Sequence, residues 1–171
     1  MRSRSLIAVP LAALALASCG DDKKDTAEEP AKTADTQEKA APLKPSGELA
    51  KKPDVKVPSA PAPKKLQIRD LIEGKGPSSN QGDTLRVQYV GVLYKNGKEF
   101  DSSWKTGKPF EFQVGAGMVI PGWDEGLVGM RVGTRRQLVI PPDLAYGAEG
   151  APPAIGPNET LLFVVDLVGI S

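Results

Sequence analysis

Residues 119–127 read VIPGWDEGL, and this stretch predicts a short helix that delivers a tryptophan to the interior of the fold. Pro121 suits the first helical position, where its missing N–H would have no partner in any case, and Asp124 places negative charge near the positive end of the helix dipole. The apolar positions recur at i, i+4 and i+7 on one side of the helix, and they are Trp123, Leu127 and Met130. This apolar stripe predicts that the helix lies against a sheet.

Two interpretations of Trp123 are open at this point. Large aromatic side chains most often fill a hydrophobic core, and a single tryptophan on a short helix fits that description. A tryptophan that is surrounded by other aromatic side chains can instead form the floor of a binding site. The choice between them depends on the rest of the chain.

Composition excludes several classes of active site. The chain has 171 residues, 22 Lys and Arg, 21 Asp and Glu and a formal net charge of +1, which gives no indication of a nucleic-acid partner. It contains one cysteine and no histidine. Ser-His-Asp and Cys-His catalytic groups and imidazole-based metal sites are therefore excluded. We expect neither a metal ion nor a cofactor.

Residues 1–18 are predicted to form a lipoprotein signal peptide. Arg2 and Arg4 precede an apolar run from Leu6 to Ala17. A positively charged start followed by a short apolar run is typical of an export signal. The run is too short for a permanent transmembrane helix.

Residues 16–19 read LASC and resemble the bacterial lipobox, in which the cysteine is acylated and becomes the new N-terminus. Cys19 is then the lipidation site, and two or more acyl chains hold a protein stably on a membrane. The resemblance implies an exported protein that is lipid-anchored to the bacterial cell envelope. Gly20 after the cysteine favours the periplasmic side of the outer membrane in a diderm organism. The alternative is a chance cysteine after an ordinary signal peptide.

Residues 19–65 combine the predicted lipidated cysteine with a disordered tether. From residue 20 on, this segment has no aromatic side chain, few aliphatic ones and many alanine, proline and lysine residues. Such a composition cannot bury enough apolar surface to offset the entropy lost on ordering the chain. A flexible chain of this length has an end-to-end distance on the order of 40 Å, so we expect it to hold the following domain clear of lipid headgroups.

Residues 66–171 are predicted to form one folded domain. Alternating aliphatic side chains bounded by turn residues are typical of strands, and they cover residues 66–72, 84–95, 100–104, 110–114, 134–140 and 159–170. Asn96-Gly97 fits a type I′ hairpin turn. The pattern predicts an α+β fold, in which an antiparallel sheet of about five strands packs on one short helix. The long Gly/Pro-rich loop over residues 144–158 is itself a sign of function.

Five blocks of this domain resemble the FKBP-type peptidyl-prolyl cis-trans isomerases in order and in spacing. The blocks are QYVG at 88–91, FDSS at 100–103, VIPGW at 119–123, AYG at 145–147 and LLF at 161–163. The resemblance covers residues 66–171, and with the lipobox it points to a bacterial lipoprotein form of the family. It implies a half-open antiparallel sheet wrapped over the helix, with a hydrophobic pocket between them. We expect this domain to be monomeric.

The resemblance also implies the residues of the pocket, carried over position by position. Trp123 forms the floor, and the implied catalytic residues are Tyr89, Asp101, Trp123 and Tyr146. The implied substrate-binding residues are Phe100, Phe110, Val119, Ile120, Ile155 and Phe163. The backbone N–H of Ile120 and the hydroxyl of Tyr146 would donate to ligand carbonyls. Phe112, in contrast, is expected to be a core residue, as most aromatics on strands are.

Asp101 has two interpretations from the residues alone. It is either a solvated turn residue or a buried carboxylate, and a buried carboxylate needs partners. The family pattern offers the Tyr89 hydroxyl as that partner. The family often has a basic residue in the following loop, whereas this chain has Thr106 near that place.

The implied chemistry agrees with the residues available. Rotation about a peptide bond meets a barrier of about 18–20 kcal/mol, because the planar amide is stabilised by resonance. The twisted amide is less polar at its carbonyl, so an apolar pocket favours it without a nucleophile or a metal. The expected function is peptidyl-prolyl cis-trans isomerisation of X-Pro bonds in exported proteins, by non-covalent stabilisation of the twisted amide.

Two other functions are alternatives to this one. The first is a module that binds proline peptides or macrolides and catalyses only incidentally. The second is a holdase chaperone, which is disfavoured because residues 141–160 are too short for the inserted domain that chaperone-active relatives carry. The expected partners are proline-containing segments of exported proteins, macrolide inhibitors, and a membrane reached through the lipid.

Overall fold

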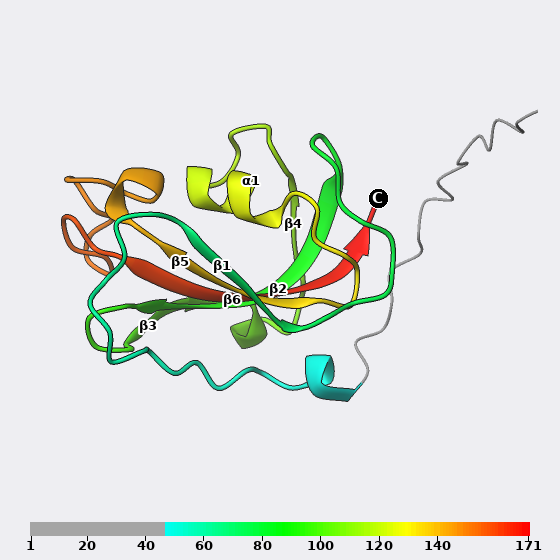
Figure 1. The fold of residues 1–171 in the computed structure, drawn as a ribbon, viewed down its shortest axis with the longest axis horizontal. Helices are drawn as coiled ribbons and strands as arrows, with labels where there is room; N and C mark the ends of the chain where they lie inside the picture. The colour runs from blue at the N-terminus through cyan, green and yellow to red at the C-terminus, as the bar shows by residue number, and fades with distance from the viewer. Residues whose placement is uncertain (1–46) are drawn as a thin grey trace, which may run out of the picture. The chain divides into compact units, whose positions relative to one another are not determined.

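The computed structural model describes residues 47–171, and its main element is a six-stranded antiparallel sheet (Figure 1). The strands are β1 (Gln67–Ile72), β2 (Thr84–Leu93), β3 (Glu99–Ser102), β4 (Phe110–Gln113), β5 (Arg135–Ile140) and β6 (Leu161–Ile170). With the one short helix α1 (Pro121–Leu127), the predicted α+β class is confirmed. Residues 1–46, which include the predicted signal peptide and Cys19, lie outside the described residues.

The strand order β1-β5-β6-β2-β3 places β6 and β2 at the centre of the sheet. Along its other edge β2 carries two short strands, because β4 pairs with residues 84–87 and β3 pairs with residues 90–92. The sheet therefore has six strands where the sequence predicted about five. The strand bounds differ from the predicted ones by only a few residues.

The hairpin between β2 and β3 forms at the predicted place but with a different turn. The Leu93 N–H donates to the Lys98 carbonyl at 2.9 Å, and the Gly97 N–H donates to the Leu93 carbonyl at 2.8 Å. Gly97 has a φ of 68°, whereas Asn96 is not among the described residues with positive φ. A type I′ turn needs positive φ at both central residues. The predicted turn type is therefore wrong, because the loop is longer and only its glycine adopts the left-handed conformation.

Helix α1 packs closely on β5 because glycines face the sheet. A Cβ atom at Gly126 would come within 2.8 Å of the Leu138 side chain, so a larger residue would push the helix away. The predicted apolar stripe is buried, with exposed fractions of 4% or less, and consists of Trp123, Leu127 and Met130. The close approach fixes the depth at which Trp123 sits above the sheet.

The sheet is buried on both faces, and the strand period of two divides its side chains into two clusters. The cluster on the inner face, toward α1, includes Leu138, Ile140, Phe163 and Val165. The cluster on the outer face consists of Val90, Val92, Tyr94, Val139, Leu162 and Val164. Strand β6 is buried on both sides along residues 161–169, as the sequence predicts for a central strand.

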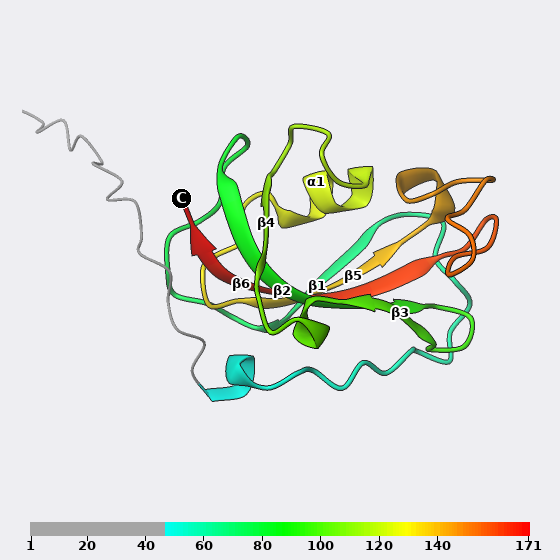
Figure 2. The ribbon, with the colours of Figure 1, turned by 180° about the vertical axis from the view of Figure 1, so that it is seen from behind.

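A segment that we call the strap, residues 47–60, lies across the outer face. Figures 1 and 2 show it on the side of the sheet opposite α1, beginning with the short helix η1 (Gly47–Ala50). Its half-buried positions are Leu49, Pro53, Val55 and Val57, and the last three alternate with exposed residues. Residues 47–60 belong to the segment that the sequence predicts to be a disordered tether, yet their valines pack on the sheet. These valines meet an apolar face that the composition of the tether does not reveal.

The long loop between β5 and β6 is held by its own hydrogen bonds. It begins with η3 (Pro142–Leu144), and the Gly147 N–H donates to the Pro142 carbonyl at 2.9 Å. Ala151 and Ile155 exchange two backbone hydrogen bonds of 2.9 and 3.0 Å. These bonds give the loop a defined path beside α1 and so position Tyr146.

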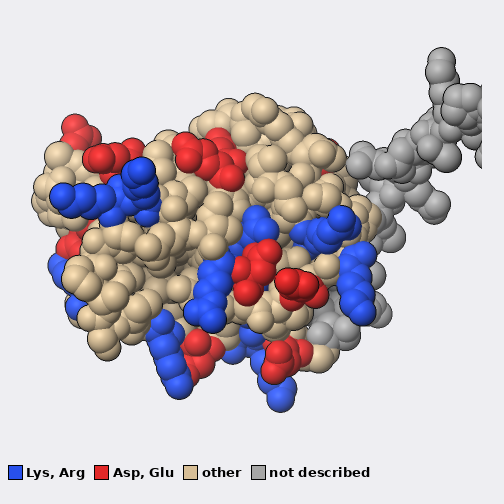
Figure 3. Space-filling model, in the orientation of Figure 1, with Lys and Arg blue, Asp and Glu red and all other residues tan. Residues whose placement is uncertain are grey.

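The described surface carries charges of both signs. Acidic and basic side chains are interspersed on the face shown in Figure 3. Within residues 47–171, no helix combines the length and the apolar character that a membrane crossing requires.

Candidate active site

A pocket of about 290 Å³ lies between α1 and the inner face of the sheet. Its lining residues are Tyr89, Phe100, Asp101, Phe110, Met118, Val119, Ile120, Trp123, Tyr146 and Phe163. The structure thus brings together every predicted pocket residue except Ile155. The volume is at the small end of the range for ligand pockets, about 300–1,000 Å³, which suits one or two residues of a peptide.

Two residues differ from the sequence prediction. Ile155 is 4% exposed and packs in the same core cluster as Trp123 and Phe163, but it is not among the residues that line the pocket. Met118 lines the pocket and is 66% exposed, although the sequence analysis did not select it. A methionine in a glycine-rich loop has no distinctive pattern, and only its position next to Val119 could have indicated a place at the rim.

Trp123 forms the floor, as predicted, and other rings stand on it at steep angles. Its ring centroid is 5.2 Å from that of Tyr89 and 5.3 Å from that of Phe163, with interplanar angles of 84° and 82°. Edge-to-face contacts of this kind are a favourable geometry for aromatic pairs. The indole N–H is buried and has no hydrogen-bond partner among the described residues. The floor is therefore an indole ring held by packed aromatic neighbours.

The wall opposite α1 depends on Gly91 in β2. A Cβ atom at this position would lie 2.7 Å from ring atoms of both Phe100 and Phe163. Because glycine has no Cβ, these two rings pack directly over the strand, edge to face, with centroids 5.5 Å apart. On the other side Phe110 stacks on the buried Phe112 and is 42% exposed. The predicted core position of Phe112 is confirmed.

Asp101 is the one carboxylate in the lining, and it has two hydrogen-bond donors. The Tyr89 hydroxyl donates to Asp101 Oδ2 at 2.5 Å, and the Ser102 N–H donates to Oδ1 at 2.8 Å. Asp101 is exposed, and no Lys or Arg among the described residues forms an ion pair with it. Thr106 lies near the place where the family often has a basic residue, and its hydroxyl donates to the Ser103 carbonyl at 3.0 Å. Asp101 therefore combines the two interpretations. It is exposed, as a turn residue would be, and it also accepts a hydrogen bond from Tyr89.

Both pocket tyrosines hold their protons more tightly than free tyrosine does. Burial raises the pKa of Tyr89, and the hydrogen bond to Asp101 and its negative charge raise it further. Burial also raises the pKa of Tyr146, with a contribution from the charge of Asp101. Free tyrosine titrates near pH 10. Both hydroxyls are therefore protonated donors at neutral pH.

The loop before α1 presents a backbone donor to the pocket. Ile120 is the N-cap residue of α1, and its N–H makes no hydrogen bond among the described residues. Asp124 braces this loop, since its carboxylate accepts from the N–H groups of Gly115 and Gly117 at 2.8 and 2.9 Å. The pocket therefore combines an apolar floor with two donors, the Ile120 N–H and the Tyr146 hydroxyl, that could orient a carbonyl.

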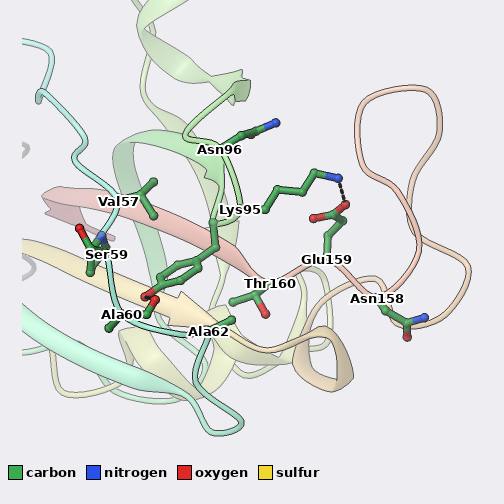
Figure 4. A pocket seen from close by; sticks show the side chains of 11 residues that line it. Val57, Ser59, Ala60, Ala62, Lys95, Asn96, Asn158, Glu159 and Thr160 are labelled. Carbon is green, nitrogen blue, oxygen red and sulfur yellow. Dashed lines mark hydrogen bonds and ion pairs between the residues drawn. The ribbon is translucent and has the colours of Figure 1, made fainter.

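A larger pocket of about 580 Å³ lies elsewhere, between the strap, the β2–β3 hairpin and the end of the long loop (Figure 4). Its lining is mostly small or polar, and Lys95 and Glu159 form an ion pair across it. The larger volume does not make it the better candidate, because its lining contains no cluster of aromatic rings. Within residues 47–171, no group of His, Cys, Asp and Glu side chains is arranged to hold a metal ion.

Comparisons with known proteins give similar sequences and a similar fold. The family model of the FKBP-type peptidyl-prolyl cis-trans isomerases matches residues 76–168. An FK506-binding protein of Streptomyces anulatus is 52% identical over 120 residues, which cover 70% of this chain and 97% of that protein. A probable FK506-binding protein of Corynebacterium glutamicum is 45% identical over 117 residues, covering 68% and 97%. The crystal structure of AtFKBP13 superimposes with a TM-score of 0.59 at 41% identity, covering 64% of this chain and 96% of that one.

Proposed function

Because the chain belongs to the family of FKBP-type peptidyl-prolyl cis-trans isomerases, we propose that its aromatic pocket accelerates X-Pro isomerisation by stabilising a twisted amide. The isomerase activity itself is the activity of the family. The mechanism and the client proteins are the parts that we infer. The observation that carries the mechanism is the set of rings packed edge to face around Trp123, which leaves an apolar space beside two hydrogen-bond donors.

Catalysis in this pocket follows from differential binding. In the planar amide the carbonyl oxygen carries extra negative charge from resonance, and twisting the C–N bond removes it. Rings of Tyr89, Trp123 and Phe163 exclude water from the proline and favour the less polar, twisted form. The Ile120 N–H and the Tyr146 hydroxyl donate hydrogen bonds to peptide carbonyls near the proline. These bonds hold the proline in place while the rest of the peptide rotates about the X-Pro bond.

No step requires a proton to leave the protein. The chain has no histidine, and the raised pKa values of Tyr89 and Tyr146 keep these hydroxyls protonated across the neutral range. Asp101 acts on Tyr89 by accepting its hydrogen bond, which fixes the ring that stands on the floor. We therefore assign Asp101 a positioning role.

A protease-coupled isomerisation assay tests this function. The full chain should shorten the relaxation of short Leu-Pro and Ala-Pro peptides from the uncatalysed time of about tens to hundreds of seconds, in proportion to its concentration. A chain that binds such peptides but leaves the relaxation unchanged would be a binding module instead. Both functions predict that the peptide binds, so only catalytic turnover distinguishes them.

Macrolides are the second proposed class of ligand. The relatives from Streptomyces anulatus and Corynebacterium glutamicum are FK506-binding proteins by name, and the rings around Trp123 offer an apolar surface to such a compound. FK506 should inhibit the coupled assay competitively with the peptide. Inhibition that is independent of peptide concentration would place the macrolide outside the pocket.

The cellular location is proposed from the N-terminal sequence alone. Export, lipidation of Cys19 and anchoring to the cell envelope rest on the LASC motif at residues 16–19, which lies outside the described residues. In a diderm host the Gly20 that follows supports the periplasmic side of the outer membrane. The clients are then proline-containing segments of exported proteins. Cys19→Ser should move the protein from the membrane fraction to the soluble fraction, and retention on membranes without palmitate labelling of the parent would contradict lipidation.

A further inference from the structure

The outer face of the sheet carries an apolar cluster on the side opposite α1. Its six members are buried, with exposed fractions of 8% or less. Contiguous apolar surface of this kind is uncommon on monomeric proteins and usually marks an interaction site. What covers it here is the strap, because Val55 and Val57 pack on the cluster together with Trp104.

A buried ion pair beneath the strap also depends on it. The Arg135 guanidinium donates to both carboxylate oxygens of Asp166, at 2.6 and 2.7 Å, and their exposed fractions are 8% and 0%. A guanidinium carries five N–H donors, so this pair leaves some of them without a partner. Arg135 Nη2 donates further to the carbonyls of Glu48 and Lys51, at 3.1 and 2.9 Å. The strap backbone therefore completes the hydrogen bonding of a buried cation.

Two further contacts hold the strap along its length. Lys52 forms an ion pair of 2.7 Å with Glu99 on β3, and the Tyr94 hydroxyl donates to the Ala60 carbonyl at 3.1 Å. Among the described residues, no backbone hydrogen bond joins the strap to a strand. The strap thus crosses the face of the sheet and does not extend its edge. It is recognised by side chains that the sheet supplies.

We propose that the outer face is a docking surface for an extended segment of the same chain, residues 47–60, and that the folded isomerase unit therefore includes this segment. The alternation of half-buried Pro53, Val55 and Val57 with exposed Asp54 and Lys56 fits a segment with one face on the cluster. Because the strap and α1 lie on opposite sides of the sheet (Figure 1), the strap covers this face without obstructing the pocket.

Tryptic cleavage between Lys51 and Lys52 in the full chain tests the proposal, since this bond adjoins the carbonyl held by Arg135. The double variant Val55→Ser/Val57→Ser removes the apolar contacts. Its matched control is Asp54→Ser/Lys56→Arg, which changes two exposed neighbours and keeps the trypsin site after residue 56. Cleavage of a segment that opens transiently follows the population of the open form. We expect the valine variant to be cut about tenfold faster or more, and the control to be cut at nearly the parent rate.

Equal cleavage rates in the two double variants would overturn the proposal. Isomerase activity should match the parent in both variants, because neither pair of residues contacts the pocket. If the valine variant also loses activity, Val55→Ser alone provides the milder change, and it must again be cut faster than Asp54→Ser. The parent should resist trypsin equally at low and high protein concentration. Protection that disappears on dilution would make the occupant a second copy and would also overturn the proposal.

Discussion

The two faces of the sheet are built from adjacent residues of the same strands and perform different tasks. On β6, Phe163 points to the inner face and joins the rings around Trp123, while Leu162 and Val164 point to the outer face and meet the strap. The inner face keeps a pocket of about 290 Å³. The outer face is covered by a segment of its own chain.

The difference shows that the alternation of side chains along a strand decides which face each residue is buried on. The shape of those side chains then decides whether the face keeps a binding pocket. The rings of Phe163 and Tyr89 stand at 82° and 84° to the ring of Trp123, and rings packed edge to face in this way leave space for a ligand ring. Branched aliphatic side chains adapt to their neighbours and pack to the density of a protein interior. The outer face can therefore be closed by two valines of an otherwise polar segment.

Trp123→Ala should have the largest effect and should break the inner face alone. Removing a fully buried tryptophan costs about 3–5 kcal/mol of unfolding free energy, and it should also reduce isomerisation to nearly the uncatalysed rate. Urea unfolding and the protease-coupled assay measure the two effects. The control is Leu162→Ala on the outer face, a position that is 0% exposed and should cost about 2–5 kcal/mol while the folded protein keeps its activity. Equal activity losses in the two variants would mean that the faces are not functionally separate.

Arg135→Met should have the next largest effect, and its effect should depend on pH. It leaves Asp166 buried without its partner, and breaking a buried pair costs about 3 kcal/mol or more. Burial raises the pKa of Asp166, although Arg135 opposes this. A carboxyl with a raised pKa contributes its full stability below its unfolded value near 4 and loses it as the pH rises through the folded value. Without Arg135 this loss grows, so the variant should be weaker relative to the parent at pH 7 than at pH 4. The same deficit at both pH values would contradict this account.

Asp101→Asn should have a moderate effect on the inner face and none on the shape of the pH profile. Replacing the carboxylate weakens the hydrogen bond from Tyr89, and a hydrogen bond contributes about 0.5–1.5 kcal/mol, so kcat/KM should fall about threefold to tenfold. Both proteins should show a nearly constant rate between about pH 6 and pH 8, since the raised pKa values keep Tyr89 and Tyr146 protonated. A steep inflection in the parent that the variant lacks would make Asp101 a proton-transfer group.

Met118→Ala should have the smallest effect, confined to the rim of the pocket. The side chain is 66% exposed, so its loss should change stability by less than about 0.5 kcal/mol. It should raise KM by about twofold for Leu-Pro peptides, whose larger side chain can contact the rim, and less for Ala-Pro peptides. Val128→Ala, at a position 41% exposed and outside the pocket lining, is the control. Equal changes in the two variants would remove Met118 from the rim.

The pocket rim, the hairpin turn and the strap are features that the sequence predicted only in part. The resemblance selected the pocket residues with the exception of Met118, and it also included Ile155, which packs in the adjoining core cluster and is not in the lining. Asn96-Gly97 located the hairpin, but the turn type depended on where β2 and β3 stop pairing. The strap was assigned to the tether because composition records how many apolar residues a segment has. It does not record whether a matching surface exists elsewhere in the chain.

The sequence by itself determined the class of the fold, the helix that carries Trp123 and the absence of histidine chemistry, because these depend on local periodicity and residue type. Only the tertiary structure decided the distances within the pocket, the partners of Asp101 and Arg135, and the docking of residues 47–60 on the outer face. Each of these joins segments that are far apart along the chain. Their contacts depend on the register and twist of the whole sheet, which no local pattern encodes.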